Sequence, residues 1–310
     1  MRRIHVIAVA GLMLASIGVT TGGRAASSQP GFADVYPAQA AATYDPNDRG
    51  TNFWALLIGI NDYESPTKDN IGSRQDARDL RQHLFDNRWR GDHITIISDR
   101  YATASMIIQG IRWLASKTND QSVVIFHYSG HQNYTRTSAD GDNEPRDQMI
   151  RAHDNRYILD GILGRELDRV RAQKMWINMA VCRAAGFNDR GMVKTGRVLT
   201  YSSYESELSY EDPAVHYTVH GWYLVIEAMR QGVGDYNGDG QVTVEEAFRY
   251  AKPRILNRTK GRQHAVLVDK LSGSFYIPAP APPPPPTPPP PPPRNCTLII
   301  CTGAAAAREA

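Results

Sequence analysis

The chain has few cysteines, little net charge and only one long apolar run. Its three cysteines are Cys182, Cys296 and Cys301, and the last two are close enough in sequence to form a small disulfide loop in an oxidising compartment. That pairing would leave Cys182 as the single free thiol. The formal net charge is +3, and the Lys and Arg residues are scattered and form no basic cluster in the sequence. We therefore expect no nucleic-acid partner.

The long apolar run lies at the N-terminus. Arg2 and Arg3 precede an apolar stretch over residues 4–19, and small residues follow it, which is typical of an export signal. We predict a signal peptide over residues 1–26, with a retained N-terminal anchor as the alternative. No other run approaches the ~20 apolar residues that a membrane-spanning helix needs, so we expect a secreted or cell-envelope protein.

Three further segments lack the pattern of a folded domain. Residues 27–50 are rich in Ala, Pro, Ser and Gln and predict a disordered leader. Residues 278–294 are almost pure proline and predict an extended linker. Its stretch 278–293 is either a ligand for a cell-wall or proline-binding partner or a spacer without a partner. Residues 295–310 are predicted to form a disordered tail.

Residues 51–277 alternate strand and helix patterns and are predicted to form one domain. Short apolar runs rich in β-branched and aromatic residues predict six strands, over residues 53–60, 94–97, 123–131, 175–182, 198–202 and 264–268. Helical periodicity follows most of them. Repeated βα units of this kind predict an α/β fold, a three-layer α/β/α sandwich with a mainly parallel sheet of about six strands.

Local signals between these strands give four more expectations. Ser73 and Asp76 have the spacing of a helix capping box, and Thr103 is placed to cap the next helix. Polar residues predict a long loop over residues 132–149, and helical periodicity predicts a helix over residues 158–172.

Two strand ends carry the reactive side chains. The run that begins at Val123 ends in Ser129-Gly130-His131, and the run that begins at Met175 ends in Cys182. Neighbouring parallel strands would bring this imidazole and this thiol together at the carboxyl edge of the sheet, where open α/β sheets bind ligands. A cysteine and a histidine together can act as a nucleophile and its general base. A lone cysteine at a strand end is also often only a small buried apolar residue. His127 lies deeper in the sheet and is interpreted as structural.

These strand ends resemble the caspase-like cysteine peptidases (peptidase family C14), the branch that includes metacaspases and bacterial homologues. The first strand and its turn, residues 54–63, also resemble that family, as do Asp76-Ala77 and Ala102-Thr103. The resemblance covers residues 52–270 and implies the same three-layer fold. It also implies a protein or peptide substrate.

The resemblance assigns roles to six residues. It implies that Cys182 attacks the scissile carbonyl, that His131 moves protons, and that the Gly130 and Cys182 amides stabilise the oxyanion. It places Asp154, Ser203 and Glu205 in or near the substrate pocket.

The chain departs from the family at two positions. The residue after the histidine is Gln132 and not Gly. Two residues before the cysteine, Ala180 replaces an Asp that in metacaspases helps the pocket accept Arg or Lys before the cleaved bond. Arg183 is placed either to lower the thiol pKa or to favour an acidic substrate residue.

Residues 235–246 match an EF-hand calcium loop position by position. The predicted oxygen ligands come from Asp235, Asn237, Asp239, Gln241 (through its backbone carbonyl), Thr243 and Glu246. Gly240 permits the sharp turn of the loop. Because there is only one such loop, we expect Ca²⁺ to stabilise the last helices and not to act as a signal; a polar loop without a metal is the alternative.

Three functions follow from these patterns, the third of them a calcium-stabilised, wall-associated scaffold that the proline-rich segment retains and that has no peptidase activity. The first is an exported, calcium-binding cysteine endopeptidase that uses Cys182 and His131. The second is a catalytically inactive caspase-like domain that acts as a calcium-stabilised protein-binding module. The departures from the family at Gln132 and Ala180 favour this second function.

Overall fold

The computed structural model describes residues 52–141, 145–189 and 191–277. The predicted signal peptide, leader, proline-rich linker and tail lie outside these residues, as do Cys296 and Cys301. Within the described part of the chain, no helix combines the length and apolarity needed to cross a membrane.

A six-stranded sheet forms the centre of the fold, in the order β11-β8-β7-β3-β1-β2. Its strands are β1 (Phe53–Gly59), β2 (Ile94–Ser98), β3 (Val123–Ser129), β7 (Lys174–Ala180), β8 (Arg197–Tyr201) and β11 (Val266–Asp269). The first five pair in parallel, and β11 pairs antiparallel with β8 at one edge. The predicted mainly parallel sheet is therefore confirmed.

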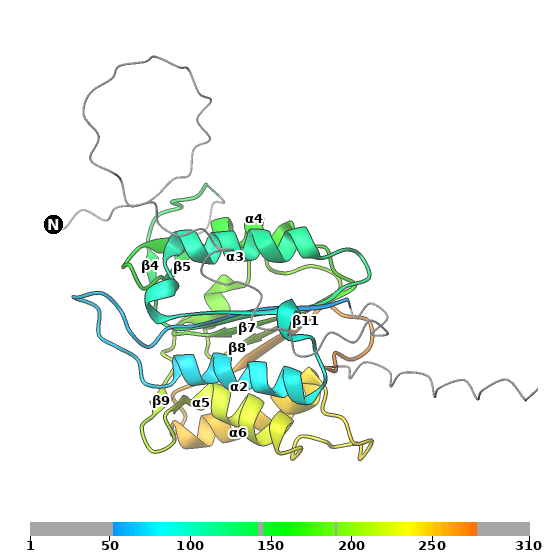
Figure 1. Ribbon diagram of the computed structural model, residues 1–310. Coiled ribbons are helices and arrows are strands. Elements are labelled where there is room, and N and C mark those ends of the chain that lie inside the picture. The colour runs from blue at the N-terminus through cyan, green and yellow to red at the C-terminus, as the bar shows by residue number, and fades with distance from the viewer. Residues whose placement is uncertain (1–51, 142–144, 190, 278–310) are drawn as a thin grey trace, which may run out of the picture. The chain divides into compact units, whose positions relative to one another are not determined.

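Helices cover both faces of this sheet (Figure 1). One face carries α3 (Ala104–Lys117) and α4 (Asp160–Asp168). The other carries α2 (Ser73–Asp86), the short α5 (Val219–Gly221), which continues into the π-helix η4 (Trp222–Arg230), and α6 (Val244–Arg258). Because helices cover both faces of the sheet, the central strands are buried on both sides, and their sequences are continuous apolar runs. This is the three-layer α/β/α arrangement that the sequence predicts.

Short elements surround the carboxyl edge of the sheet. An antiparallel sheet contains β4 (Gln132–Thr135), β5 (Asp147–Arg151) and β6 (Tyr157–Leu159), and a small hairpin pairs β9 (Glu211–Asp212) with β10 (Tyr217–Thr218). Three single 3₁₀ turns complete the described elements: η1 (Gly91–His93), η2 (Asp99–Tyr101) and η3 (Ala184–Phe187).

Three local expectations were wrong. The predicted loop 132–149 contains β4 and begins β5, and the predicted helix 158–172 is shortened to α4 because Ile158 and Leu159 belong to β6. The capping box is absent: Gly72 is the N-cap of α2, without a side-chain cap, and the Asp76 carboxylate turns inward to Ser129 and Thr218. The Thr103 cap is confirmed, since its hydroxyl accepts the Met106 N–H at 3.3 Å.

Buried polar side chains join the central strands on the α2 face. Asn178 of β7 contacts the His127 ring at 3.1 Å and the His220 ring at 2.9 Å, and it accepts a hydrogen bond from Thr200. Burial lowers the pKa of both imidazoles to about 3, so both are neutral at pH 7. This network agrees with the structural interpretation of His127.

Candidate active site

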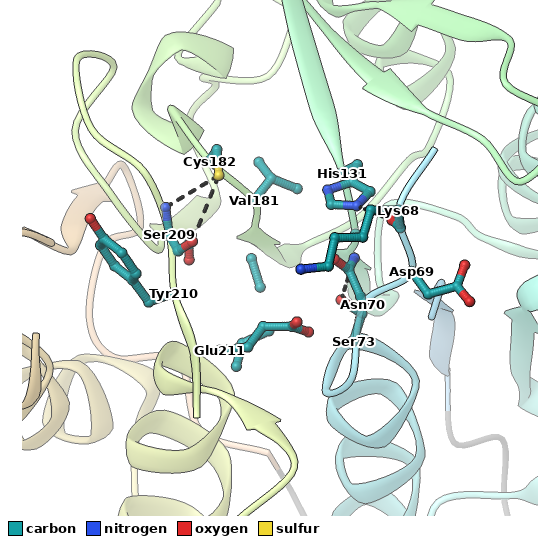
Figure 2. A pocket seen from close by; sticks show the side chains of 13 residues that line it. Lys68, Asp69, Asn70, Ser73, His131, Val181, Cys182, Ser209, Tyr210 and Glu211 are labelled. Carbon is teal, nitrogen blue, oxygen red and sulfur yellow. Dashed lines mark hydrogen bonds between the residues drawn. The ribbon is translucent and has the colours of Figure 1, made fainter. Parts of the chain in front are cut away.

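The two strand ends do meet. Because β3 and β7 are adjacent and parallel, with Ser129 beside Ala180, the residues that follow them lie at one edge of the sheet. There His131 and Cys182 line the same cavity of ≈ 250 Å³ (Figure 2). Figure 2 shows the imidazole and the thiol on opposite sides of this cavity, and no hydrogen bond joins them in the described structure.

The His131 ring is fixed by a backbone carbonyl. Its Nε2 lies 2.7 Å from the Lys68 carbonyl oxygen. A carbonyl only accepts, so Nε2 carries the proton and Nδ1 holds the lone pair of a neutral ring. Burial lowers the pKa of His131 below its ordinary value, so the neutral form dominates at pH 7. His131 can therefore accept a proton at Nδ1.

The Cys182 sulfur lies against the backbone of Ser209. The Ser209 N–H donates to Sγ at 3.4 Å, and the thiol lies 3.7 Å from the Ser209 carbonyl oxygen. Burial raises the pKa of the Cys182 thiol, and the nearby Arg183 charge only partly offsets this. The thiol is therefore protonated at neutral pH and needs a base to become a nucleophile.

The two predicted oxyanion donors differ in availability. The Gly130 N–H donates to the Ala180 carbonyl at 3.3 Å in the structure described, so its role as an oxyanion donor stays a prediction that requires this hydrogen bond to open. The Cys182 N–H donates to no carbonyl among the described residues and borders the cavity. Gly130 still lines the cavity, but for a steric reason: a Cβ there would lie 2.6 Å from the Tyr63 hydroxyl.

The three other predicted pocket residues lie outside this cavity. Ser203 is fully buried, and its hydroxyl accepts the Ala184 N–H at 3.3 Å. Glu205 is exposed and pairs with Arg146 at 3.5 Å. Asp154 accepts the Ala104 N–H at 3.2 Å and so contributes to the N-terminus of α3. All three thus have partners elsewhere, and their place in the substrate pocket stays a prediction.

Arg183 also faces away from the cavity. Its guanidinium donates to the Glu205 carbonyl at 3.0 Å and lies 4.9 Å above the centre of the Tyr134 ring. Arg183 does not line the cavity that contains the thiol. This orientation removes the direct basis for recognition of an acidic substrate residue.

Sequence reasoning missed the acidic part of the cavity. Glu211 lines it with its side chain directed toward Ser73 (Figure 2), and its carboxylate accepts the N–H groups of Ile71 at 3.0 Å and Gly72 at 2.8 Å. Asp69 also lines the cavity. The sequence offered only a weak signal, because Glu211 is the last residue of a polar stretch after the fifth strand and Asp69 lies in an ordinary loop.

A second acidic group lies beneath the cavity. Asp76 is fully buried and accepts hydrogen bonds from the hydroxyls of Ser129 at 2.9 Å and Thr218 at 2.6 Å. Burial raises the pKa of this carboxyl to about 8. Asp76 does not line the cavity itself, but its hydrogen-bond partner Thr218 does.

A buried carboxyl also begins α4. Asp160 accepts the Gln148 N–H at 2.7 Å and its pKa is raised to about 8, chiefly by burial and further by the charges of Asp189 and Asp140. In the described ranges, no group of three or more His, Cys, Asp or Glu side chains is arranged to hold a metal ion.

The predicted calcium loop is folded by its own side chains. The Asp235 carboxylate accepts the N–H groups of Gly238 at 2.7 Å and Gly240 at 2.9 Å, and Asp239 accepts that of Gln241 at 2.8 Å. Gly240 has a φ of +82°, as the sharp turn of such a loop requires. Thr243 and Glu246 form a capping box at the start of α6. The oxygen-rich donor set fits a hard cation, although Glu246 is held by the cap.

Comparison with known proteins agrees with this fold. The caspase-domain family model matches residues 52–276, so the chain belongs to the caspase-domain family of cysteine peptidases. It is 32% identical over 97 residues to Metacaspase-1 of Scheffersomyces stipitis, covering 29% of this chain and 24% of that protein. It is 30% identical over 112 residues to Metacaspase-1B of Neurospora crassa, covering 34% and 26%. The chain thus spans about a quarter of the length of these relatives.

One solved structure supports the fold. The protein GSU0716 from Geobacter sulfurreducens superposes with a TM-score of 0.54 at 14% identity, over 71% of this chain and 94% of that one. At this identity the likeness concerns the fold alone.

Proposed function

We propose that this chain is an exported cysteine endopeptidase in which Cys182 is the nucleophile and His131 the general base and acid. The observation that carries the proposal is the shared cavity, with a neutral imidazole whose Nδ1 is available and a thiol that needs a base. The family relationship supports protein or peptide substrates. Export rests on the predicted signal peptide, residues 1–26.

The reaction begins with proton transfer and attack. When the substrate carbonyl enters between the two side chains, His131 Nδ1 takes the thiol proton and the sulfur bonds to the carbonyl carbon. Negative charge then develops on the carbonyl oxygen, and the Cys182 N–H is the available backbone donor for it. Since Nε2–H stays bonded to the Lys68 carbonyl, the imidazolium that forms is also stabilised.

The second half of the reaction returns the enzyme to its starting state. His131 gives its proton to the leaving amine as the C–N bond breaks, which leaves a thioester on Cys182. Water then loses a proton to the same imidazole and attacks the thioester, and the thiolate recovers that proton when it leaves. No redox partner is required.

The cavity supports a preference for a basic residue before the cleaved bond. Glu211 lines the cavity, while the Arg183 guanidinium donates to the Glu205 carbonyl and Arg183 does not line the cavity. Ala180, which has a small side chain, lines the same cavity as Glu211. A Lys or Arg side chain that enters would pair with Glu211 and would favour ionisation of Asp76 below. Glu211 would thus supply the negative charge that the chain lacks at position 180.

We further propose that the loop 235–246 binds Ca²⁺ and thereby stabilises the domain. Asp235, Asn237, Asp239, the Gln241 carbonyl, Thr243 and Glu246 would hold the ion, which would supply charge neutralisation in the loop. Binding requires Glu246 to release the Thr243 backbone N–H that it accepts at 3.0 Å. The adjacent Val244 N–H donates to the Phe275 carbonyl at 2.6 Å, so the loop is joined to the end of the domain.

The alternative function, an inactive protein-binding domain, draws on the raised pKa of Cys182 and the residues Gln132 and Ala180. Alkylation of the native protein with iodoacetamide at pH 7 separates the two. A working pair predicts fast modification of Cys182 that His131→Ala slows at least ~10-fold. Equal rates in both proteins would favour the inactive domain.

A further inference from the structure

The backbone of His131 is held by a tyrosine from a distant part of the chain. The His131 N–H donates to the Tyr63 hydroxyl at 2.8 Å, and the two rings lie 4.9 Å apart, tilted by 40°. Tyr63 is only 5% exposed, so this hydrogen bond is sheltered from water. Its hydroxyl contacts that of Tyr128, which in turn donates to the Arg151 carbonyl at 2.6 Å. The His131 amide therefore begins a buried chain of hydrogen bonds.

The same loop that carries Tyr63 also holds the His131 ring. Lys68, whose carbonyl accepts from Nε2, is five residues further along the chain. The loop is closed on itself because the Tyr63 N–H donates to the Asp69 carboxylate at 3.1 Å. Tyr63 and Lys68 are thus tied together, and they hold the backbone and the ring of His131 respectively.

Gly130 is the position that makes this arrangement possible. A Cβ at residue 130 would lie 2.6 Å from the Tyr63 hydroxyl and 2.9 Å from the Tyr128 hydroxyl, closer than van der Waals contact allows. Only glycine lets the two hydroxyls approach the backbone before His131. The close approach of Tyr63 therefore explains why residue 130 is a glycine. The Gly130 N–H does not explain it, because that group donates to the Ala180 carbonyl.

We infer that Tyr63 is a positioning residue: its hydroxyl and the Asp69-closed loop set the direction of the His131 ring, so that Nδ1 faces the cavity. This inference rests on the proposed peptidase reaction for its kinetic consequence, but its structural content does not. Without the hydroxyl, the His131 N–H loses its acceptor, and the loop that presents the Lys68 carbonyl to the ring loses its link to the His131 backbone, so the ring direction is less fixed. Misdirection of a catalytic group slows chemistry and leaves substrate binding intact.

The test compares Tyr63→Phe with Tyr201→Phe in the full chain. Tyr201 is also a buried tyrosine with one hydrogen bond, to the Phe187 carbonyl at 3.2 Å, and it lies outside the cavity. We expect Tyr63→Phe to lower kcat at least ~10-fold at a KM within about twofold of wild type, and Tyr201→Phe to leave kcat unchanged. Equal kcat in Tyr63→Phe and wild type, or a change confined to KM, would overturn the inference.

A second readout does not depend on cleavage. The ¹⁵N shifts of the His131 ring should report the Nε2–H tautomer in the wild type and a mixture of tautomers in Tyr63→Phe. If the wild type fails to cleave any peptide but shows this difference, the positioning role holds and the proposed function fails. A ring that keeps the Nε2–H tautomer in Tyr63→Phe would contradict the positioning role.

Should Tyr63→Phe fail to fold, the exposed Asp69 offers the same test. Asp69→Ala opens the loop and should lower kcat, whereas Asp69→Asn keeps an oxygen for the Tyr63 N–H and should restore most of it. Equal kcat values in these two variants would contradict the inference.

Discussion

The Nε2 atom of His131 donates its proton to the carbonyl oxygen of Lys68 at 2.7 Å, across 63 positions of sequence. This contact fixes the tautomer of the ring and leaves Nδ1 as the basic atom. Cys182 shares the cavity and has a raised pKa because it is buried. In the proposed reaction the neutral imidazole is the base and the protonated thiol is the nucleophile that it activates.

The first prediction concerns pH. Since burial lowers the pKa of His131 below 6.5, its neutral form persists into mildly acidic solution and is lost as pH falls through that lowered pKa. We expect the acid limb of kcat/KM to have its midpoint below pH 6.5. A midpoint above 6.5 would contradict a buried, neutral base.

The second prediction concerns substrate charge. Glu211→Gln keeps the size of the side chain but removes the charge of a residue that lines the cavity. We expect KM for substrates with Arg before the cleaved bond to rise about tenfold, the effect of losing ~1.4 kcal/mol. Glu205→Gln, an exposed acid outside the cavity, is the matched control. Equal KM values in Glu211→Gln and wild type would remove Glu211 from recognition.

The third prediction concerns stability and Asp160. The pKa of Asp160 is about 8 in the folded protein, and its ordinary value is 3.8. Its contribution to the free energy of unfolding is therefore fully present below pH 3.8 and is lost as pH rises through about 8. In wild type the free energy of unfolding should decrease between these two pH values, and in Asp160→Asn this decrease should be smaller. Asp120→Asn, an exposed acid with a lowered pKa, should leave that slope unchanged. Denaturant unfolding at several pH values measures both.

The fourth prediction concerns Ca²⁺ and the loop 235–246. If the loop binds the ion in the folded state, Ca²⁺ at 100 times its Kd should add ~2.7 kcal/mol to the unfolding free energy. Calorimetric titration of Glu246→Gln should show a weaker affinity, since this residue would supply both carboxylate oxygens. Thermal unfolding that does not respond to Ca²⁺ in the wild type would contradict the proposed site.

Much of the fold was predictable from the sequence, because buried parallel strands read as continuous apolar runs. The runs at Phe53 and Val123 each became a central strand, and the cap at Thr103 formed as expected. The capping box at Ser73 failed for a tertiary reason. The Asp76 side chain has closer partners in Ser129 and Thr218, which are remote in sequence.

The candidate site was predictable only at its two strand ends. His131 and Cys182 follow apolar runs, so topology alone brings them together. The residues that hold them come from irregular loops: Lys68, Tyr63 and Ser209 act through contacts 63, 68 and 27 positions away. No periodicity reports such contacts. For the same reason Ser203 and Asp154, which the family resemblance places near the substrate pocket, could not be placed from sequence: they accept the first backbone N–H groups of η3 and α3 and do not line this cavity.

The most direct test of the account is cleavage of a peptide library by the full chain, with Cys182→Ala as the control and Ca²⁺ present. The account predicts cuts after Lys or Arg that disappear in Cys182→Ala. Folded, Ca²⁺-treated protein that cleaves nothing, or cleavage that persists in Cys182→Ala, would contradict it.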